Sequence, residues 1–199
     1  VFSNPCNPTA VTMSREDILK IVGAVDAMVV VDEAYMEFSE GSVLDEIENY
    51  ENLIVLKTCS KAFGMAAIRL GFAAANARIT NILKTLKAPY NVNSMTQAVG
   101  CVILGHREYL EKCTAQIKAS TQELYQNMAA LAEKKKDIQK LYPTETNFLY
   151  LKTEHSGEIF EALKKEGISI RNMNGYLRIS AGSRAENQEL IRALDKLLQ

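Results

Sequence analysis

The stretch NLIVLKTCSKAFG, residues 52–64, leads from a run of apolar residues into a lysine, Lys61, set among small residues. A short, continuous apolar run of this kind predicts a strand that is buried on both faces of a parallel sheet. Two interpretations of the lysine compete. Lys61 is either a solvated side chain just past a strand, or a lysine held for imine chemistry, because a partly desolvated amine loses its proton readily and becomes a nucleophile.

Around this stretch, apolar runs alternate with helical patterns, which is typical of an α/β protein. The run AMVVVDEAY at 27–35 predicts a second buried strand, and RLGFAAA at 69–75 predicts a third. Ser14 is expected to cap a first helix. A long helix is expected to start near Arg107, because apolar residues recur there at steps of three and four. The basic run KKK that follows it is interpreted as a solvated helix end.

After this helix the pattern changes to short strands and helices, with Ser183 and Glu186 placed to form a capping box at the last helix. The sequence therefore predicts three parts. Residues 1–105 form the remainder of a large domain with a mostly parallel sheet and helices, residues 106–136 form a long connecting helix, and residues 137–199 form a small α+β domain. The chain opens on VFSNPCNPTA without an initiator methionine, so we expect it to be the later part of a longer chain.

The composition excludes several classes of function. The 199 residues carry a formal net charge of −1, so no broad electrostatic attraction to nucleic acid or to an anionic membrane is expected. No apolar run reaches the roughly 18 residues that a membrane span needs. The four cysteines lie far apart, which argues against a zinc site and a disulfide framework and favours a reducing cytoplasm.

Polar residues with chemical potential follow the first two predicted strands. Asp32 falls where a buried strand ends, and ligands of open α/β sheets bind beyond those ends; as a single motif, a turn-capping aspartate explains it equally well. Thr58 and Ser60 offer hydroxyls and Arg69 a guanidinium within a dozen residues of Lys61. Hydroxyls with one arginine make a phosphate-binding site, because the guanidinium fork matches phosphate oxygens. Taken singly, Arg69 is better explained as a surface residue or as part of a salt bridge.

Two further motifs lie near the ends of the chain. NPCNPTA at 4–10 is a turn stiffened by prolines, in which Asn7 either shapes the turn or presents its amide to a ligand. In YLRIS, Arg178 interrupts an apolar strand and needs an anion, either a carboxylate of the protein or that of a substrate. A lysine for an imine, an aspartate for a protonated ring nitrogen and a phosphate site together are what pyridoxal phosphate requires.

With these motifs in this order, the chain resembles the fold-type I aminotransferases that use pyridoxal 5′-phosphate, and within them most resembles the histidinol-phosphate aminotransferases. NPCNPTA, VVVDEAYMEFS, NLIVLKTCSKAFGMAAIRLGFAAAN and YLRIS followed by glycine carry the resemblance, which runs from the first residue to the last. Ala10 stands where the family has glycine, which argues against a positive φ there. The resemblance also implies a front part, outside this chain, that completes the cofactor pocket.

The resemblance implies a role for each cofactor-site residue. Lys61 is the lysine that binds the cofactor covalently and carries the catalytic proton. Asp32 holds the pyridine nitrogen protonated, which makes the ring a better electron sink. Tyr35 and Asn7 hydrogen-bond the phenolic oxygen. Ser60, Arg69 and Thr58 bind the cofactor phosphate.

On the substrate side, the resemblance implies that Arg178 pairs with the α-carboxylate and that Arg171 lies near a distal phosphate, with Asn7 also facing the substrate. The implied reaction moves an amino group between histidinol phosphate and 2-oxoglutarate, in histidine biosynthesis. An aromatic-amino-acid aminotransferase and a threonine-phosphate decarboxylase share most of these residues and remain alternatives. A catalytically inert, truncated fragment is the alternative of another class. The family also implies a homodimer. The dispersed cysteines and histidines favour a cytoplasmic protein without a metal site.

Overall fold

The structure, a computed structural model, describes residues 1–198. By their contacts these residues form two units. The first consists of residues 1–6 and 12–114, and the second of residues 7–11 and the chain from Ala115 onward. The short segment 7–11 therefore packs with the later half of the chain. The three-part division expected from the sequence remains a prediction.

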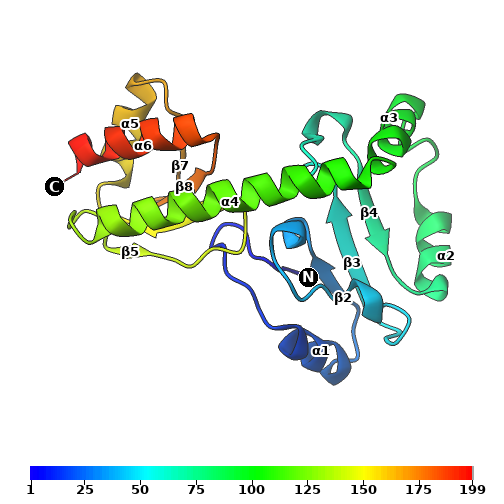
Figure 1. Ribbon diagram of the computed structural model, residues 1–199. Coiled ribbons are helices and arrows are strands. Elements are labelled where there is room, and N and C mark those ends of the chain that lie inside the picture. The colour runs from blue at the N-terminus through cyan, green and yellow to red at the C-terminus, as the bar shows by residue number, and fades with distance from the viewer. Residues whose placement is uncertain (199) are drawn as a thin grey trace. The chain divides into compact units, whose positions relative to one another are not determined.

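The first unit is built on a mixed sheet in the order β1-β2-β3-β4. Its strands are β1 (Phe2–Ser3), β2 (Val29–Asp32), β3 (Leu53–Thr58) and β4 (Gly71–Ala74). β1, β2 and β3 run parallel to one another. β4 runs antiparallel to β3, as Figure 1 shows. The three strands expected from the sequence are present, and the fold class is confirmed as α/β.

Helices follow the strands of this unit. They are α1 (Arg15–Ala24), α2 (Ala77–Leu86) and α3 (Ser94–Leu104), with short 3-10 turns η1 (Met36–Phe38), η2 (Leu44–Glu46) and η3 (Ala66–Ile68). Ser14 caps α1 as expected, because its hydroxyl accepts a hydrogen bond from the Asp17 amide at 3.1 Å.

One face of the sheet is buried under α1. Ile18 and Val22 of α1 pack with Val31 of β2 and Val55 of β3 in one apolar cluster. Successive residues of a strand point to opposite faces, so Asp32 and Thr58 lie on the face away from α1. This alternation separates the apolar support of the sheet from its polar face.

The second unit contains the later part of α4 (Arg107–Ala132) and an antiparallel sheet in the order β5-β6-β8-β7. The strands are β5 (Lys140–Leu141), β6 (Phe148–Lys152), β7 (Arg171–Asn172) and β8 (Tyr176–Ser180). The remaining helices are α5 (Ser156–Lys165) and α6 (Arg184–Leu197), which lie beside each other in Figure 1.

The core of this unit lies between the helices and one face of its sheet. Leu124 and Met128 of α4 are fully buried there with Leu149 of β6, Leu163 of α5 and Leu194 of α6. The apolar stripe expected on the long helix is thereby confirmed. The capping box of Ser183 and Glu186 at the start of α6 is also present.

Two expectations from the sequence are wrong. Ala10 has a φ of 65° although it is not glycine, and its fully buried position holds it in this left-handed conformation. Lys135, in the basic run after α4, is not a solvated helix end. Its Nζ donates hydrogen bonds to the carbonyls of Asp195 at 2.7 Å and Leu198 at 3.0 Å. It thus caps the end of α6, a distant helix that the local sequence does not announce.

No helix within residues 1–198 is both long enough and apolar enough to cross a membrane.

Candidate functional site

The polar residues of the first unit gather where β2 and β3 end. The two strands are parallel neighbours, with Asp32 opposite Leu56, so their carboxyl ends lie at the same edge of the sheet. Asp32 is the last residue of β2 and Thr58 the last of β3. Both side chains point to the same face of the sheet, because both are offset by an even number of residues from that paired position.

The carboxylate of Asp32 is oriented by its own turn. Its Oδ1 accepts a hydrogen bond from the Ala34 amide at 3.0 Å, and the side chain remains only half-buried. This Asx turn fixes one oxygen and leaves the other able to meet a cationic group. The chain then turns through Tyr35, which is buried with 6% of its surface exposed.

Lys61 approaches this turn from the neighbouring strand. Its Nζ lies 5.4 Å from the centroid of the Tyr35 ring, within the range of a cation–π contact. Lys61 belongs to the turn after β3, and Tyr35 to the turn after β2, three residues beyond Asp32. The fold therefore brings the exposed amine of Lys61 to the aspartate-bearing turn.

Apolar residues pack against one another within the turn that carries Lys61. Cys59 and Met65 are buried in one cluster, and the Met65 amide donates to the Cys59 carbonyl at 3.0 Å. Gly64 closes the turn with a φ of 66° and donates to the Lys61 carbonyl at 3.0 Å. Burial raises the pKa of the Cys59 thiol, and the nearby Glu37 carboxylate adds to this effect. Cys59 is therefore an inert anchor of this turn, whereas the Lys61 side chain is exposed.

The hydroxyls expected at a phosphate site lie on the same turn. The Thr58 hydroxyl accepts a hydrogen bond from the Ser60 amide at 3.1 Å, which places both residues at the start of the turn. Arg69 follows η3 in a left-handed conformation, with a φ of 55°, and its Nη1 donates to the Ala66 carbonyl at 3.0 Å. The guanidinium is otherwise exposed, so it retains donors for an anion.

The second unit brings together Asn7, Arg171 and Arg178. Nη1 of Arg178 donates to Oδ1 of Asn7 at 2.7 Å. Arg178 of β8 lies directly opposite Arg171 of β7, so the two guanidinium groups share a face of the sheet. Like charges in directly opposite positions repel, and this favours binding of an anion between or beside them.

Aromatic residues that sequence reasoning missed lie on the same face. Tyr150 of β6 is the other cross-strand neighbour of Arg178, and the Arg178 guanidinium lies 4.9 Å from the centre of the Phe148 ring. Tyr150 and Tyr176 stack with ring centres 5.0 Å apart and planes 4° apart. The alternation in FLYLK and YLRIS could have indicated this aromatic face, since the leucines and the isoleucine between these residues form the core.

The expected site residues thus form two groups. Those of the first unit are Asp32, Tyr35, Thr58, Ser60, Lys61 and Arg69, and those of the second are Asn7, Arg171 and Arg178. Within the first group, contacts join Lys61 to Tyr35 and Thr58 to Ser60. Within the second, contacts join Asn7 to Arg178.

Residues 1–194 of the chain match the family described as aminotransferase class I and II. The chain belongs to the class I and II aminotransferases. A curated relative from Clostridium kluyveri, named histidinol-phosphate aminotransferase, is 44% identical over 203 residues, covering 100% of this chain and 56% of the relative. This chain therefore spans about half the length of the curated aminotransferases that it matches.

Solved aminotransferase structures share the fold. The histidinol-phosphate aminotransferase from Clostridium acetobutylicum superimposes with a TM-score of 0.88 at 23% identity, over 98% of this chain and 62% of that structure. The enzyme of the same name from Sinorhizobium meliloti, solved with pyridoxal-5′-phosphate, gives a TM-score of 0.86 at 24% identity, over 98% of this chain and 56% of that structure. At these identities, the likeness to solved structures shows the fold.

Proposed function

We propose that this chain supplies the lysine, the ring-nitrogen aspartate and the substrate arginine of a pyridoxal-phosphate-dependent aminotransferase. The observation that carries this proposal is the approach of the Lys61 amine to the Tyr35 ring, at the turn that follows Asp32. An amine and a carboxylate at neighbouring strand ends, on the open edge of an α/β sheet, suit a small heterocycle that reacts with the amine.

The donor set fits this cofactor. Two hydroxyls and a guanidinium, from Thr58, Ser60 and Arg69, match an exposed phosphate dianion. The oxygen of Asp32 that does not bond Ala34 matches a protonated pyridine nitrogen. When bound, pyridoxal phosphate supplies an aldehyde carbon for the amino group and an electron-withdrawing ring that stabilises negative charge on the substrate carbon.

The residues of the first unit then divide the work. The Asp32 carboxylate would keep the proton on the ring nitrogen of the bound cofactor by charge attraction. The Tyr35 hydroxyl would donate a hydrogen bond to the phenolic oxygen of the bound cofactor. With the cofactor bound, the Lys61 amine would move the proton between the substrate carbon that bears the amino group and the aldehyde carbon of the cofactor.

The residues of the second unit bind the substrate's anionic groups. Arg178, held by Asn7, pairs its fork with a carboxylate. Arg171, on the adjacent strand, meets a second anionic group. Two cations side by side suit substrates with two anionic ends, and 2-oxoglutarate is such an acceptor. The names of the curated relatives favour histidinol phosphate as the amino donor. We propose that its phosphate lies toward Arg171.

The lysine assignment is tested by reduction with borohydride. The chain is incubated with pyridoxal phosphate, reduced and digested, and the modified lysine is found by mass spectrometry. We expect the adduct on Lys61 and none on Lys57, which lies between two carboxylates. Lys61→Arg keeps the charge and should lose the adduct. An adduct on another lysine in the wild-type chain would overturn the assignment.

The substrate preference is tested by exchanging a segment between two proteins. This chain replaces the matching part of the Clostridium kluyveri relative, and amino donors are assayed with 2-oxoglutarate. We expect histidinol phosphate to be preferred over aromatic amino acids, and no release of carbon dioxide from threonine phosphate. A preference for an aromatic donor, or decarboxylation, would assign the chain to one of the other two activities. A homodimer in the cytoplasm remains a prediction of the sequence.

A further inference from the structure

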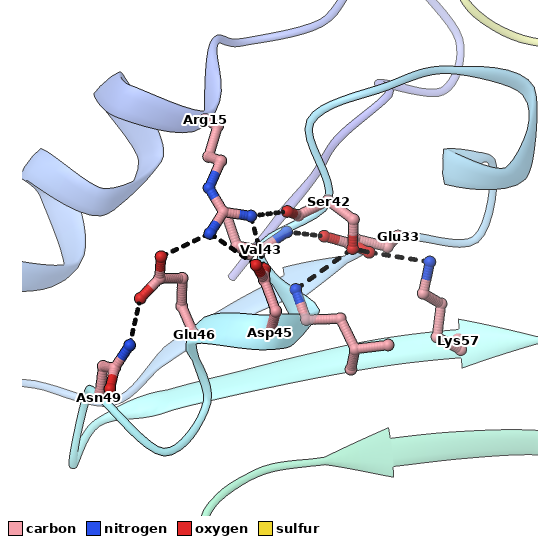
Figure 2. Close-up of polar contacts among 9 residues, drawn as sticks. Arg15, Glu33, Ser42, Val43, Asp45, Glu46, Asn49 and Lys57 are labelled. Carbon is pink, nitrogen blue, oxygen red and sulfur yellow. Dashed lines mark hydrogen bonds and ion pairs between the residues drawn. The ribbon is translucent and has the colours of Figure 1, made fainter.

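A group of ionic side chains lies beneath the candidate cofactor site, on the face of the sheet that packs on α1. Glu33 follows Asp32, and Lys57 precedes Thr58, so both point away from the face that carries Asp32 and Thr58. The Glu33 side chain is fully buried, and its Oε2 lies 2.9 Å from Nζ of Lys57. Figure 2 shows the two side chains meeting across β2 and β3.

Glu33 accepts two further hydrogen bonds. The Ser42 hydroxyl donates to Oε2 at 2.6 Å, and the Val43 amide donates to Oε1 at 2.8 Å (Figure 2). Ser42 is held in turn through its carbonyl, which accepts from the guanidinium of Arg15 on α1. The buried carboxylate is therefore fully bonded, and it fixes the loop before η2 against the end of β2.

Lys57 also reaches the segment that carries Tyr35. Its Nζ lies 3.1 Å from Oε1 of Glu37, which belongs to η1, two residues after Tyr35. The Lys57 side chain is 19% exposed and that of Glu37 is 20% exposed, so solvent screens this pair only in part. The second oxygen of Glu37 is buried and has no hydrogen-bond partner within residues 1–198. Lys57 thus compensates two carboxylates that would otherwise repel each other.

These contacts join the two strand ends that carry the candidate site. Glu33 lies between Asp32 and Tyr35, and Glu37 lies two residues after Tyr35. Lys57 is next to Thr58 and four residues before Lys61. Resting on the proposed function above, we propose that Lys57 is a positioning residue, which sets the spacing between the Asp32–Tyr35 turn and the Thr58–Lys61 turn from the reverse face of the sheet. Residues that hold a binding group in place from behind are often as necessary as the group itself.

The test compares Lys57→Met with Lys57→Arg and with a matched control, Lys20→Met. Lys20 also bridges two carboxylates of the first unit, Glu16 at 2.8 Å and Asp17 at 3.4 Å, but its side chain is 64% exposed and lies on α1. We expect Lys57→Met to weaken binding of pyridoxal phosphate about 10-fold, which is the lower end of the effect seen when a residue that supports a ligand-binding residue is removed. We expect Lys20→Met to leave this affinity unchanged. Lys57→Arg should restore most of the affinity.

A readout without cofactor separates this inference from the proposed function. Hydrogen exchange of the Ala34 and Ser60 amides reports the two turns directly, since these amides bond Asp32 and Thr58. Lys57→Met should speed exchange at both amides, while Lys20→Met should not. If the wild-type chain binds no cofactor, the proposed function fails. Hydrogen exchange at the two amides still shows whether Lys57 positions the two turns.

A purely structural role for Lys57 predicts another outcome. In that case Lys57→Met would lower the free energy of unfolding. Its cofactor affinity, the pH titration of its bound cofactor's absorbance and the hydrogen exchange of its Ala34 and Ser60 amides would all equal those of Lys20→Met. That result would overturn the inference. If Lys57→Met does not fold, Glu33→Gln takes its place, because the amide oxygen still accepts from Val43 while the charge facing Lys57 is lost.

Discussion

The ammonium group of Lys135 caps a helix that lies about 60 residues further along the chain, and its removal tests the packing of the second unit. Nζ donates to the carbonyls of Asp195 and Leu198 and lies 3.3 Å from the Asp195 carboxylate. Lys135→Met removes the charge and these hydrogen bonds. It keeps a flexible apolar side chain of similar length, so the substitution leaves no large cavity.

The expected loss follows from these contacts. A hydrogen bond from a charged donor contributes roughly 1.5–3 kcal/mol when it is well buried. The Lys135 side chain is 20% exposed, so screening lowers each of its two bonds toward about 1 kcal/mol. The attraction between the Lys135 cation and the helix dipole at the end of α6 acts through the same carbonyl groups. It therefore adds only roughly a few tenths of a kcal/mol to the two hydrogen bonds. We expect Lys135→Met to lower the free energy of unfolding by about 2 kcal/mol.

The assay is urea unfolding at low salt, followed by far-ultraviolet circular dichroism. For a slope of about 2 kcal/mol per M, the midpoint should fall by about 1 M. Lys134→Met and Lys136→Met are matched controls, since both lysines are exposed neighbours in the same basic run. Hydrogen exchange should also rise in the last turn of α6. A loss no larger than that of the two controls would refute the reasoning.

Two further outcomes follow from shifted pKa values. Hydrogen bonds from the Ser183 hydroxyl and amide hold the pKa of Glu186 below its ordinary value of 4.5. The ionised Glu186 carboxylate therefore stabilises the folded chain above pH 4.5, and this stabilisation is lost as the pH falls through the lowered pKa. Glu186→Gln should therefore lose less stability than the wild type when unfolding is measured at decreasing pH below 4.5; parallel losses would contradict the capping box. Burial raises the pKa of Cys59, whereas Cys101 is exposed. A thiol reagent should modify Cys101 in the folded chain and Cys59 only in denaturant, as judged by mass spectrometry; equal rates would contradict the burial of Cys59.

Local patterns in the sequence predicted the secondary-structure elements of this protein and led to the proposed chemistry. The apolar runs before Asp32 and Thr58 predicted β2 and β3, because strands buried on both faces need continuous apolar residues. Ser14 and Ser183 predicted helix starts, because a cap acts within one turn of its helix. The type and order of the polar residues indicated the cofactor, since a reactive group needs the same few partners wherever it binds.

Long-range contacts were decided only by the tertiary structure. The bond from Lys135 to the end of α6, the pair of Glu33 and Lys57 and the aromatic face around Arg178 each join residues far apart in the chain or on different strands. Their energy comes from burial and from the register between strands, neither of which is encoded by a residue's neighbours in sequence. The left-handed φ of Ala10 has the same origin: local propensity argues against it, and the packing around a fully buried residue overrides that propensity.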